Sequence, residues 1–176
     1  MFEFMTVREL YEICRADNAV ETDNVEYVEL EGWVRTNRDS GKVGFIALND
    51  GSYFRNCQVV YLEEKLKNFD EVSHIATGSA IHVLGKLKLT PDAKQPFEVE
   101  ATEIILEGDC DSDYPLQKKR HSFEFMREIP HLRPRANSFY AIFRLRSVLS
   151  MAIHEFFQDQ GFVYVHTPII TSNDGE

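Results

Sequence analysis

The sequence predicts an all-β barrel of five strands with a helix in front of it, followed by a connector and a long helix. Three observations support this fold class. Apolar and polar residues alternate from Val25 to Leu106, which is the period of half-buried strands. Turn signals divide that stretch into five runs. A helical period of about 3.6 residues appears before that stretch and again from Asn137 to Gln160.

The first helix is predicted to begin at Thr6. Thr6 and Glu9 have the spacing of a capping box, in which each side chain bonds the backbone N–H of the other residue. The apolar positions behind this cap are Val7, Leu10, Tyr11 and Cys14. We expect the helix to end at Asp17–Asn18.

The five predicted strands cover residues 28–35, 43–49, 56–61, 81–89 and 97–101, with a short helix over Leu62–Phe69. Asp50–Gly51 is a strong hairpin signal after the second strand. Gly32 and Gly85 lie inside strands, where a small closed barrel requires sharp bends. A helix between the third and fourth strands is the order of an OB-fold, which commonly binds oligonucleotides. Other small barrels and sandwiches also fit this pattern.

Three domains are predicted: residues 1–107 form the helix and barrel, 108–136 a connector rich in Asp, Pro and basic residues, and 137–176 the start of another domain. The helix over Asn137–Gln160 is apolar over a wide arc, so we expect it to be buried on more than one side. Gly161 is its predicted C-cap. A β-branched run follows, which predicts a strand that Pro168 ends.

The charge is distributed unevenly. The net charge is −10, yet residues 113–146 carry 8 Lys and Arg against 3 Asp and Glu. A basic segment therefore lies between two acidic ones, which suits either phosphate contact or a solvated linker. Three cysteines without CxxC spacing fit free thiols in a reducing compartment, and no apolar run reaches membrane-spanning length. These features predict a cytoplasmic protein.

The sequence contains no recognisable catalytic or metal-binding motif. It has no Gly-rich phosphate loop, no HExxH and no GxSxG, and its six histidines show no metal-ligand spacing. The candidate functional residues are therefore residues that bind a ligand. Single-stranded nucleic acid is held by aromatic rings that stack on bases, polar groups that contact base edges, and cations that contact the backbone.

The first three predicted strands supply all three kinds of group. The aromatic residues are Phe45, Trp33 and Tyr53, the polar ones Gln58 and Asn37, and the cations Arg35, Arg38, Lys42 and Arg55. Strand parity alone does not decide whether Phe45 faces the core or the solvent. For Trp33 we favour a core position.

Three segments resemble a known family. Residues 31–39 (EGWVRTNRD), 45–51 (FIALNDG) and 58–60 (QVV) resemble the anticodon-binding barrel of class II aminoacyl-tRNA synthetases of the aspartyl, asparaginyl and lysyl group. The connector, residues 114–135, resembles that of bacterial asparaginyl-tRNA synthetases, and aspartyl relatives have a shorter connecting sequence there. Residues 156–168 resemble motif 1 of class II enzymes.

The resemblance implies roles for particular residues. Phe45 would stack on the central anticodon uridine, Gln58 would contact the edge of that base, and Arg38 would contact anticodon bases or backbone. Arg35 and Asn37 precede Arg38 in the same expected anticodon-binding segment. The resemblance further implies that Lys118, Lys119 and Arg120 lie at a hinge near the tRNA backbone, and that Phe156, Phe157, Gly161 and Pro168 belong to a dimer interface.

The resemblance also implies the activity of a whole enzyme. That enzyme would be a homodimer that uses ATP and Mg²⁺ to attach asparagine to tRNA(Asn), with no membrane or DNA partner. Motifs 2 and 3, which bind ATP in class II enzymes, are missing from these 176 residues. We therefore expect an N-terminal portion that is inactive alone and binds no cofactor. The alternatives are an aspartyl-tRNA synthetase-like enzyme and a free-standing OB-fold module for tRNA or single strands, although a full motif 1 argues against the latter.

Overall fold

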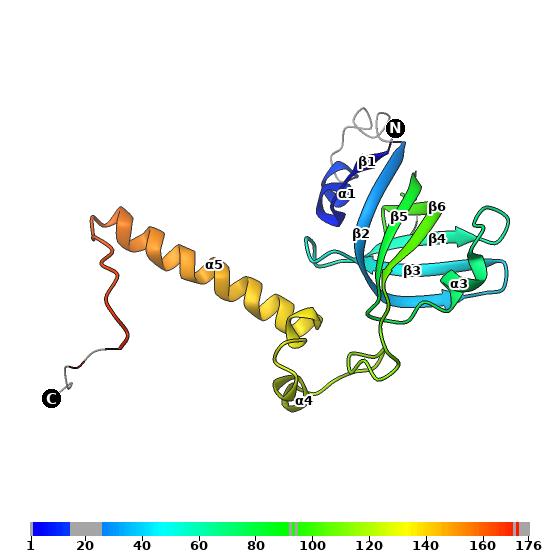
Figure 1. The fold of residues 1–176 in the computed structure, drawn as a ribbon. Helices are drawn as coiled ribbons and strands as arrows, with labels where there is room; N and C mark the ends of the chain where they lie inside the picture. The colour runs from blue at the N-terminus through cyan, green and yellow to red at the C-terminus, as the bar shows by residue number, and fades with distance from the viewer. Residues whose placement is uncertain (1, 15–25, 92, 94, 171, 173–176) are drawn as a thin grey trace. The chain divides into compact units, whose positions relative to one another are not determined.

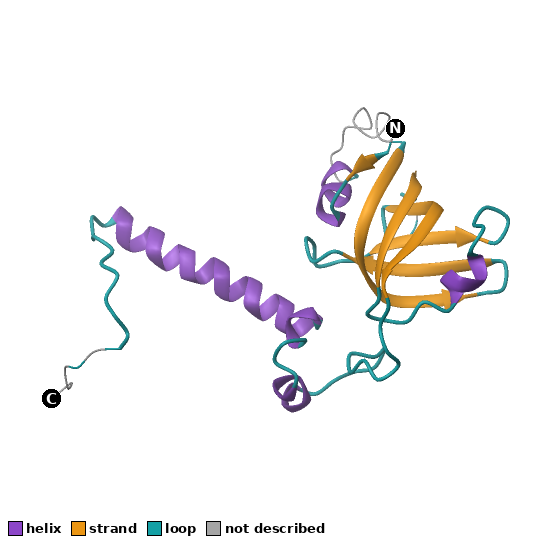
Figure 2. Ribbon diagram, viewed as in Figure 1, coloured by secondary structure: helices purple, strands orange, loops and turns teal. Residues whose placement is uncertain are grey.

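A curved sheet closes on itself in the first part of the chain (Figures 1 and 2). Its elements are β1 (Glu3–Phe4), α1 (Val7–Ile13), β2 (Tyr27–Asp39), β3 (Val43–Asn49), β4 (Cys57–Leu62), α3 (Phe69–Ser73), β5 (Ala80–Leu89) and β6 (Phe97–Gly108). The strand order is β1-β2-β3-β4-β6-β5, and β2 also pairs with β5. This closure confirms the predicted OB-fold barrel, to which β1 adds an extra strand.

The computed structural model describes residues 2–14, 26–91, 93, 95–170 and 172. The predicted end of the first helix at Asp17–Asn18 and the last four residues of the predicted third domain lie outside these ranges. Residues 1–132 and 133–176 form two separate units.

Alternating side chains of the strands fill the barrel. The inward-facing positions include Val28 and Leu30 on β2, Ile46 and Leu48 on β3, Val59 and Tyr61 on β4, Val83 on β5, and Val99 and Ala101 on β6. Each of these side chains is at most 1% exposed. The neighbouring positions on each strand therefore face outward, because successive residues of a strand point to opposite faces.

The predicted capping box of α1 is present. The backbone N–H of Thr6 donates to the Glu9 carboxylate at 2.7 Å, and Thr6 Oγ1 accepts from the Glu9 N–H at 3.3 Å. Val7, Leu10 and Tyr11 are buried in the barrel core, as their helical spacing predicted.

One of two local predictions around β3 and β4 is wrong. In place of the helix predicted over Leu62–Phe69, Leu62 ends β4, residues 63–68 form turns, and the helix α3 begins only at Phe69. Leu66 in these turns is nevertheless buried, as is Phe69 at the start of α3. The hairpin predicted at Asp50–Gly51 is present: β3 and β4 pair antiparallel across a loop over residues 50–56. The Asp50 carboxylate accepts from the N–H of Val7 at 2.8 Å and from that of Ser52 at 2.9 Å.

The first part of the predicted connector is attached to the barrel. Ser79 is buried and its hydroxyl donates to the Asp109 carboxylate at 3.3 Å. Gly78 has φ +98, and an added Cβ there would lie 2.8 Å from Cys110 Sγ and 2.9 Å from the Tyr114 ring. Further along, a helix that we did not predict, α4 (Phe123–Glu128), starts at Ser122, whose side chain accepts from a backbone N–H.

The second unit contains a 3₁₀ turn, η1 (Arg133–Arg135), and the long helix α5 (Asn137–Asp159). The C-cap is Gln160, one residue before the predicted Gly161. Gly161 follows with φ +82, and the N–H groups of Gly161 and Phe162 donate to the carbonyls of Gln158 and Phe157. These two bonds form a Schellman motif, closed by the Phe157–Phe162 ring contact at 5.3 Å.

The strand predicted after Gly161 is not formed. Residues 162–168 have no regular secondary structure. A β-branched run becomes a strand only where another strand offers backbone hydrogen bonds, and none of the described residues pairs with this segment.

Helix α5 exposes most of its apolar side chains within the second unit. Phe139 is its buried residue, and the Arg133 guanidinium lies over the rings of Phe139 and Phe143 at 5.2 and 5.6 Å. The large apolar residues exposed along the helix are Ile142, Leu145, Val148, Leu149, Met151, Ile153, Phe156 and Phe157.

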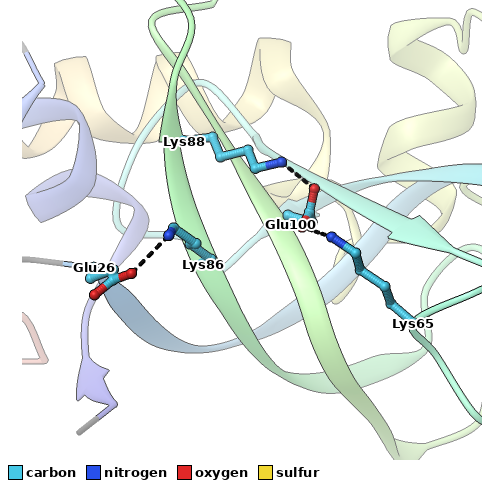
Figure 3. Close-up of polar contacts among 5 residues, drawn as sticks. All are labelled: Glu26, Lys65, Lys86, Lys88 and Glu100. Carbon is cyan, nitrogen blue, oxygen red and sulfur yellow. Dashed lines mark hydrogen bonds and ion pairs between the residues drawn. The ribbon is translucent and has the colours of Figure 1, made fainter.

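Ion pairs connect strands on the outside of the barrel (Figure 3). Glu100 on β6 accepts from Lys65, in the turn after β4, at 2.6 Å, and also from Lys88 on β5. Lys86 on β5 pairs with Glu26, just before β2, at 2.7 Å. The hydrogen bonds from Lys65 and Lys88 hold the pKa of the Glu100 carboxyl below its ordinary value of 4.5.

We expect Gly44→Ala to destabilise the barrel. A Cβ at Gly44 would lie 1.9 Å from the Tyr61 ring, which is fully buried and donates its hydroxyl proton to Asn37. Because this ring has no room to move, we expect a loss of about 1–3 kcal/mol in the free energy of unfolding. Urea unfolding followed by the fluorescence of Trp33, the single tryptophan, measures it. Gly108→Ala is the matched control, since its Cβ would meet only an ordinary contact at 3.8 Å. Equal stability of both variants would contradict this explanation.

The Glu100 ion pairs predict a pH-dependent contribution to stability. A carboxyl whose pKa is lowered in the folded state stabilises the fold above its unfolded pKa and loses that effect as the pH falls through the folded pKa. Glu100→Gln should therefore lower the urea midpoint at pH 7, and its difference from the unsubstituted chain should shrink below pH 4.5. Glu103→Gln, at an exposed position on the same strand, should show neither effect. A difference independent of pH would rule out the ion pairs as its cause.

Candidate nucleic-acid interface

Three adjacent strands present the predicted binding residues on their outer face. Phe45 on β3 lies opposite Arg38 on β2 and opposite Val60 on β4. Two residues further along the same pair of strands, Gln58 on β4 lies opposite Ala47 on β3. Directly opposed residues of antiparallel strands point to the same face, so these residues share one surface.

Phe45 does not belong to the barrel core. Its neighbours Gly44 and Ile46 are buried and face inward, whereas Phe45 is partly exposed on the outer face. Gln58 is its diagonal neighbour, at a separation of roughly 7–8 Å between such positions. A flat ring and an amide at this spacing can contact the face of one base and the edge of the same base.

The Gln58 amide has a fixed orientation. Its Nε2 donates to the Glu98 carboxylate on β6 at 2.6 Å. A carboxylate accepts hydrogen bonds and donates none, so the amide must turn its NH₂ group to Glu98 and its carbonyl oxygen away from it. Sequence reasoning missed Glu98, because the parallel pairing of β4 with β6 brings together residues that are 40 positions apart.

The two arginines of β2 have different surroundings. Arg38 is exposed beside Phe45. Arg35 is half-buried and lies at the register shift between Val34 and Thr36, where β2 bends. A bulge residue leaves the regular alternation, so Arg35 is outside the Arg38–Phe45 row.

Asn37 lies on the opposite face from Phe45 and is used inside the fold. It is paired with the buried Ile46, and its Nδ2 lies 2.7 Å from the carbonyl of Val72 and 3.2 Å from that of Ile75, at the end of α3. Its Oδ1 accepts from the Tyr61 hydroxyl at 2.9 Å, and burial raises the pKa of Tyr61 to about 12, which keeps that donor protonated. This placement argues against the predicted contact between Asn37 and an anticodon.

The preference for Trp33 as a core residue is wrong. Trp33 precedes the inward-facing Val34 and is 39% exposed. Five residues along β2 separate it from Arg38, which corresponds to roughly 15 Å of strand. Trp33 is therefore outside the group formed by Phe45, Arg38 and Gln58.

The residues that were predicted to make contacts outside the barrel are all exposed. Lys118, Lys119 and Arg120 follow the buried Leu116, and their side chains face the solvent. In the second unit, Phe156 and Phe157 are 58% and 47% exposed, and Gly161 and Pro168 are exposed as well.

The described residues contain no group of His, Cys, Asp or Glu side chains able to hold a metal ion. In the same part of the chain, every helix is too short or too polar to cross a membrane.

Two family models match the chain. The model described as "OB-fold nucleic acid binding domain" matches residues 28–107, which cover the barrel from β2 to β6. The model described as "tRNA synthetases class II (D, K and N)" matches residues 122–176, from the start of α4 onward.

Curated relatives are asparagine–tRNA ligases of bacteria. The chain is 63% identical to that of Alkaliphilus oremlandii and 60% identical to those of Clostridium perfringens and Acetivibrio thermocellus, in each case over 149 residues. Each match covers 85% of this chain and 32% of the relative, so the chain spans about a third of the length of these proteins.

Solved structures share the fold. The asparaginyl-tRNA synthetase of Pyrococcus horikoshii matches with a TM-score of 0.78 at 23% identity, over 97% of this chain and 39% of that one. The aspartyl-tRNA synthetase of Entamoeba histolytica matches with a TM-score of 0.74 at 20% identity, over 97% of this chain and 40% of that one. The barrel, both family models and the relatives at 60–63% identity agree: the chain combines an OB-fold nucleic-acid-binding domain with a segment that matches class II tRNA synthetases, and over 85% of its length it is similar to asparagine–tRNA ligases.

Proposed function

We propose that this chain binds the anticodon loop of tRNA(Asn) as part of an asparagine–tRNA ligase. The observation that supports this most is the common outer face of Phe45, Arg38 and Gln58, inside the segment that matches a nucleic-acid-binding domain. The class II synthetase match over residues 122–176 favours this function over that of a free-standing binding module. Identities of 60–63% to asparagine–tRNA ligases favour it over an aspartyl-specific enzyme.

In this proposal the whole enzyme activates asparagine with ATP and Mg²⁺ and transfers it to tRNA(Asn) in the cytoplasm. The described residues are assigned to tRNA binding and to subunit contact, and none of them is assigned to ATP or Mg²⁺. The exposed apolar residues of α5, with Phe156, Phe157, Gly161 and Pro168, would form the interface of a homodimer. Burying an apolar helix face against a symmetric copy is a common use of such a surface.

Phe45 would stack on the central uridine of the anticodon. Its ring is partly exposed on a rigid central strand, with Arg38 beside it to contact a base or a phosphate. Stacking uses the face of the base and tolerates any base, so it supplies affinity more than selectivity.

Gln58 would supply the selectivity at that uridine. Because Glu98 holds the amide NH₂ group, the carbonyl oxygen of Gln58 is available to accept from the N3–H of uracil. Cytosine has an acceptor at N3 and would meet this oxygen with a repulsive lone pair. Glu98 would therefore act as a positioning residue for Gln58.

Backbone contacts would come from the remaining cations. Lys118, Lys119 and Arg120 are exposed in the connector, and Arg35 lies at the bend of β2. Phosphate contacts of this kind fix the orientation of a nucleic acid without selecting its sequence.

We expect Phe45→Ala to weaken binding of the tRNA(Asn) anticodon stem-loop by about 1–3 kcal/mol, the usual effect of losing one stacked base. Fluorescence anisotropy of a labelled stem-loop measures this affinity. Ile105→Ala on β6, a second outward-facing apolar residue that is 39% exposed, is the matched control and should bind normally. Unchanged affinity of the Phe45 variant would show that this ring does not stack on a base.

We expect Glu98→Gln to narrow the preference for uridine over cytidine at the central anticodon position. A glutamine at position 98 can both donate and accept, so the Gln58 amide becomes free to turn and present its NH₂ group to cytidine. Loss of one oriented hydrogen bond corresponds to about 0.5–1.5 kcal/mol of discrimination.

The measurement compares stem-loops that differ only in the central base. Gln58→Ala should reduce discrimination at least as much as Glu98→Gln, and Glu103→Gln should leave it unchanged. If Glu98→Gln weakens all four stem-loops equally, Glu98 does not orient the amide.

A further inference from the structure

A hollow of about 750 Å³ lies between the segment that follows β1, the middle of β2, the loop after β3, the start of β5 and the end of β6. Near its start β2 pairs with β1, opposite Val28 and Glu29, and from Trp33 onward it pairs with β3. Glu31 and Gly32 lie on β2 between the segment paired with β1 and the segment paired with β3, and both line the hollow. We call it the Trp33 hollow.

The Trp33 hollow combines aromatic side chains with carboxylates. Phe4 and Trp33 contribute rings that are 58% and 39% exposed. Glu31, Asp50 and Glu107 also line it, and no Lys, Arg or His does so among the described residues. The Asp50 oxygens already accept from Val7 and Ser52, so the exposed carboxylates of Glu31 and Glu107 provide the charge toward a ligand.

The carboxylates and aromatic rings of the hollow disfavour binding of nucleic acid and favour binding of a cation. A phosphate group would enter a region whose described charged lining residues are all carboxylates, unlike the surface beside Arg38. A cation gains both from the carboxylates and from the face of a tryptophan ring, which is the strongest aromatic partner for cations.

We propose that the Trp33 hollow binds an arginine or lysine side chain of a partner polypeptide that lies extended along the edge of the sheet. The volume of the hollow is in the range of pockets that enclose a drug-sized ligand. It therefore accommodates a long side chain together with the backbone on either side of it, and it is larger than one ammonium group requires. The short strand β1 is the edge of the sheet beside the hollow, and an edge strand offers backbone groups to an extended segment.

The fluorescence of Trp33 provides a direct test, because this residue is the only tryptophan of the chain. The 176-residue chain is titrated with a capped Gly-Val-Arg-Val-Gly peptide and with the same peptide carrying neutral citrulline. We expect a saturable change with the arginine peptide, which weakens with added salt, and at least tenfold weaker binding of the citrulline peptide.

Charge-neutral variants locate the binding site. Glu31→Gln and Glu107→Gln should each weaken binding of the arginine peptide about two- to fivefold, as expected for an exposed ion pair. Glu103→Gln, which is exposed on β6 outside the hollow, should bind normally. The anticodon stem-loop affinity of all three variants should stay unchanged.

Three results would overturn the proposal. Equal affinities for the arginine and citrulline peptides would exclude recognition of charge. Spermidine binding as tightly as the peptide would show a site for small cations. Displacement of the peptide by the anticodon stem-loop would assign the hollow to the RNA-binding surface.

Discussion

The double pairing of β2 is the constraint on which the rest of the structure depends. Its first half is hydrogen-bonded to β5 and its second half to β3, with a register shift between Val34 and Thr36. The sheet can close on itself through this strand only if the strand bends, and Gly32 permits the close approach, since a Cβ there would lie 3.0 Å from the Asn49 carbonyl oxygen. The resulting closure decides which side chains of every strand enter the core and which reach the surface.

The closed barrel has two outward-facing aromatic sites of opposite electrostatic character. Phe45 has Arg38 beside it and lies near an amide held by Glu98, a setting suited to a base and its phosphate. Trp33 lies in a hollow whose charged lining residues are carboxylates, a setting suited to a cation. Both sites are on one barrel, yet they are separated along β2, so a negatively charged and a positively charged partner can bind without competing.

Much of the fold could be predicted from local sequence. Alternation located β3 to the residue, and the Thr6–Glu9 spacing located the start of α1, because both signals act over a few neighbouring positions. Phe45 and Gln58 were predicted to be binding residues from their chemistry together with a family resemblance, and the structure places both on the outer face of the barrel. The errors arose where local preference does not decide: residues 63–68 form turns before α3, and residues 162–168 have no strand to pair with among the described residues.

The sequence by itself determined the strand periods, the start of α1 and the kinds of chemistry available, because these depend on residues within a few positions of one another. Only the tertiary structure decided which face each strand residue occupies. The pairing of β2 with β3 turned Asn37 inward to Tyr61 and Trp33 outward, and the parallel pairing of β4 with β6 brought Glu98 to Gln58. A one-residue change of register reverses every such assignment, and register depends on contacts across the whole barrel.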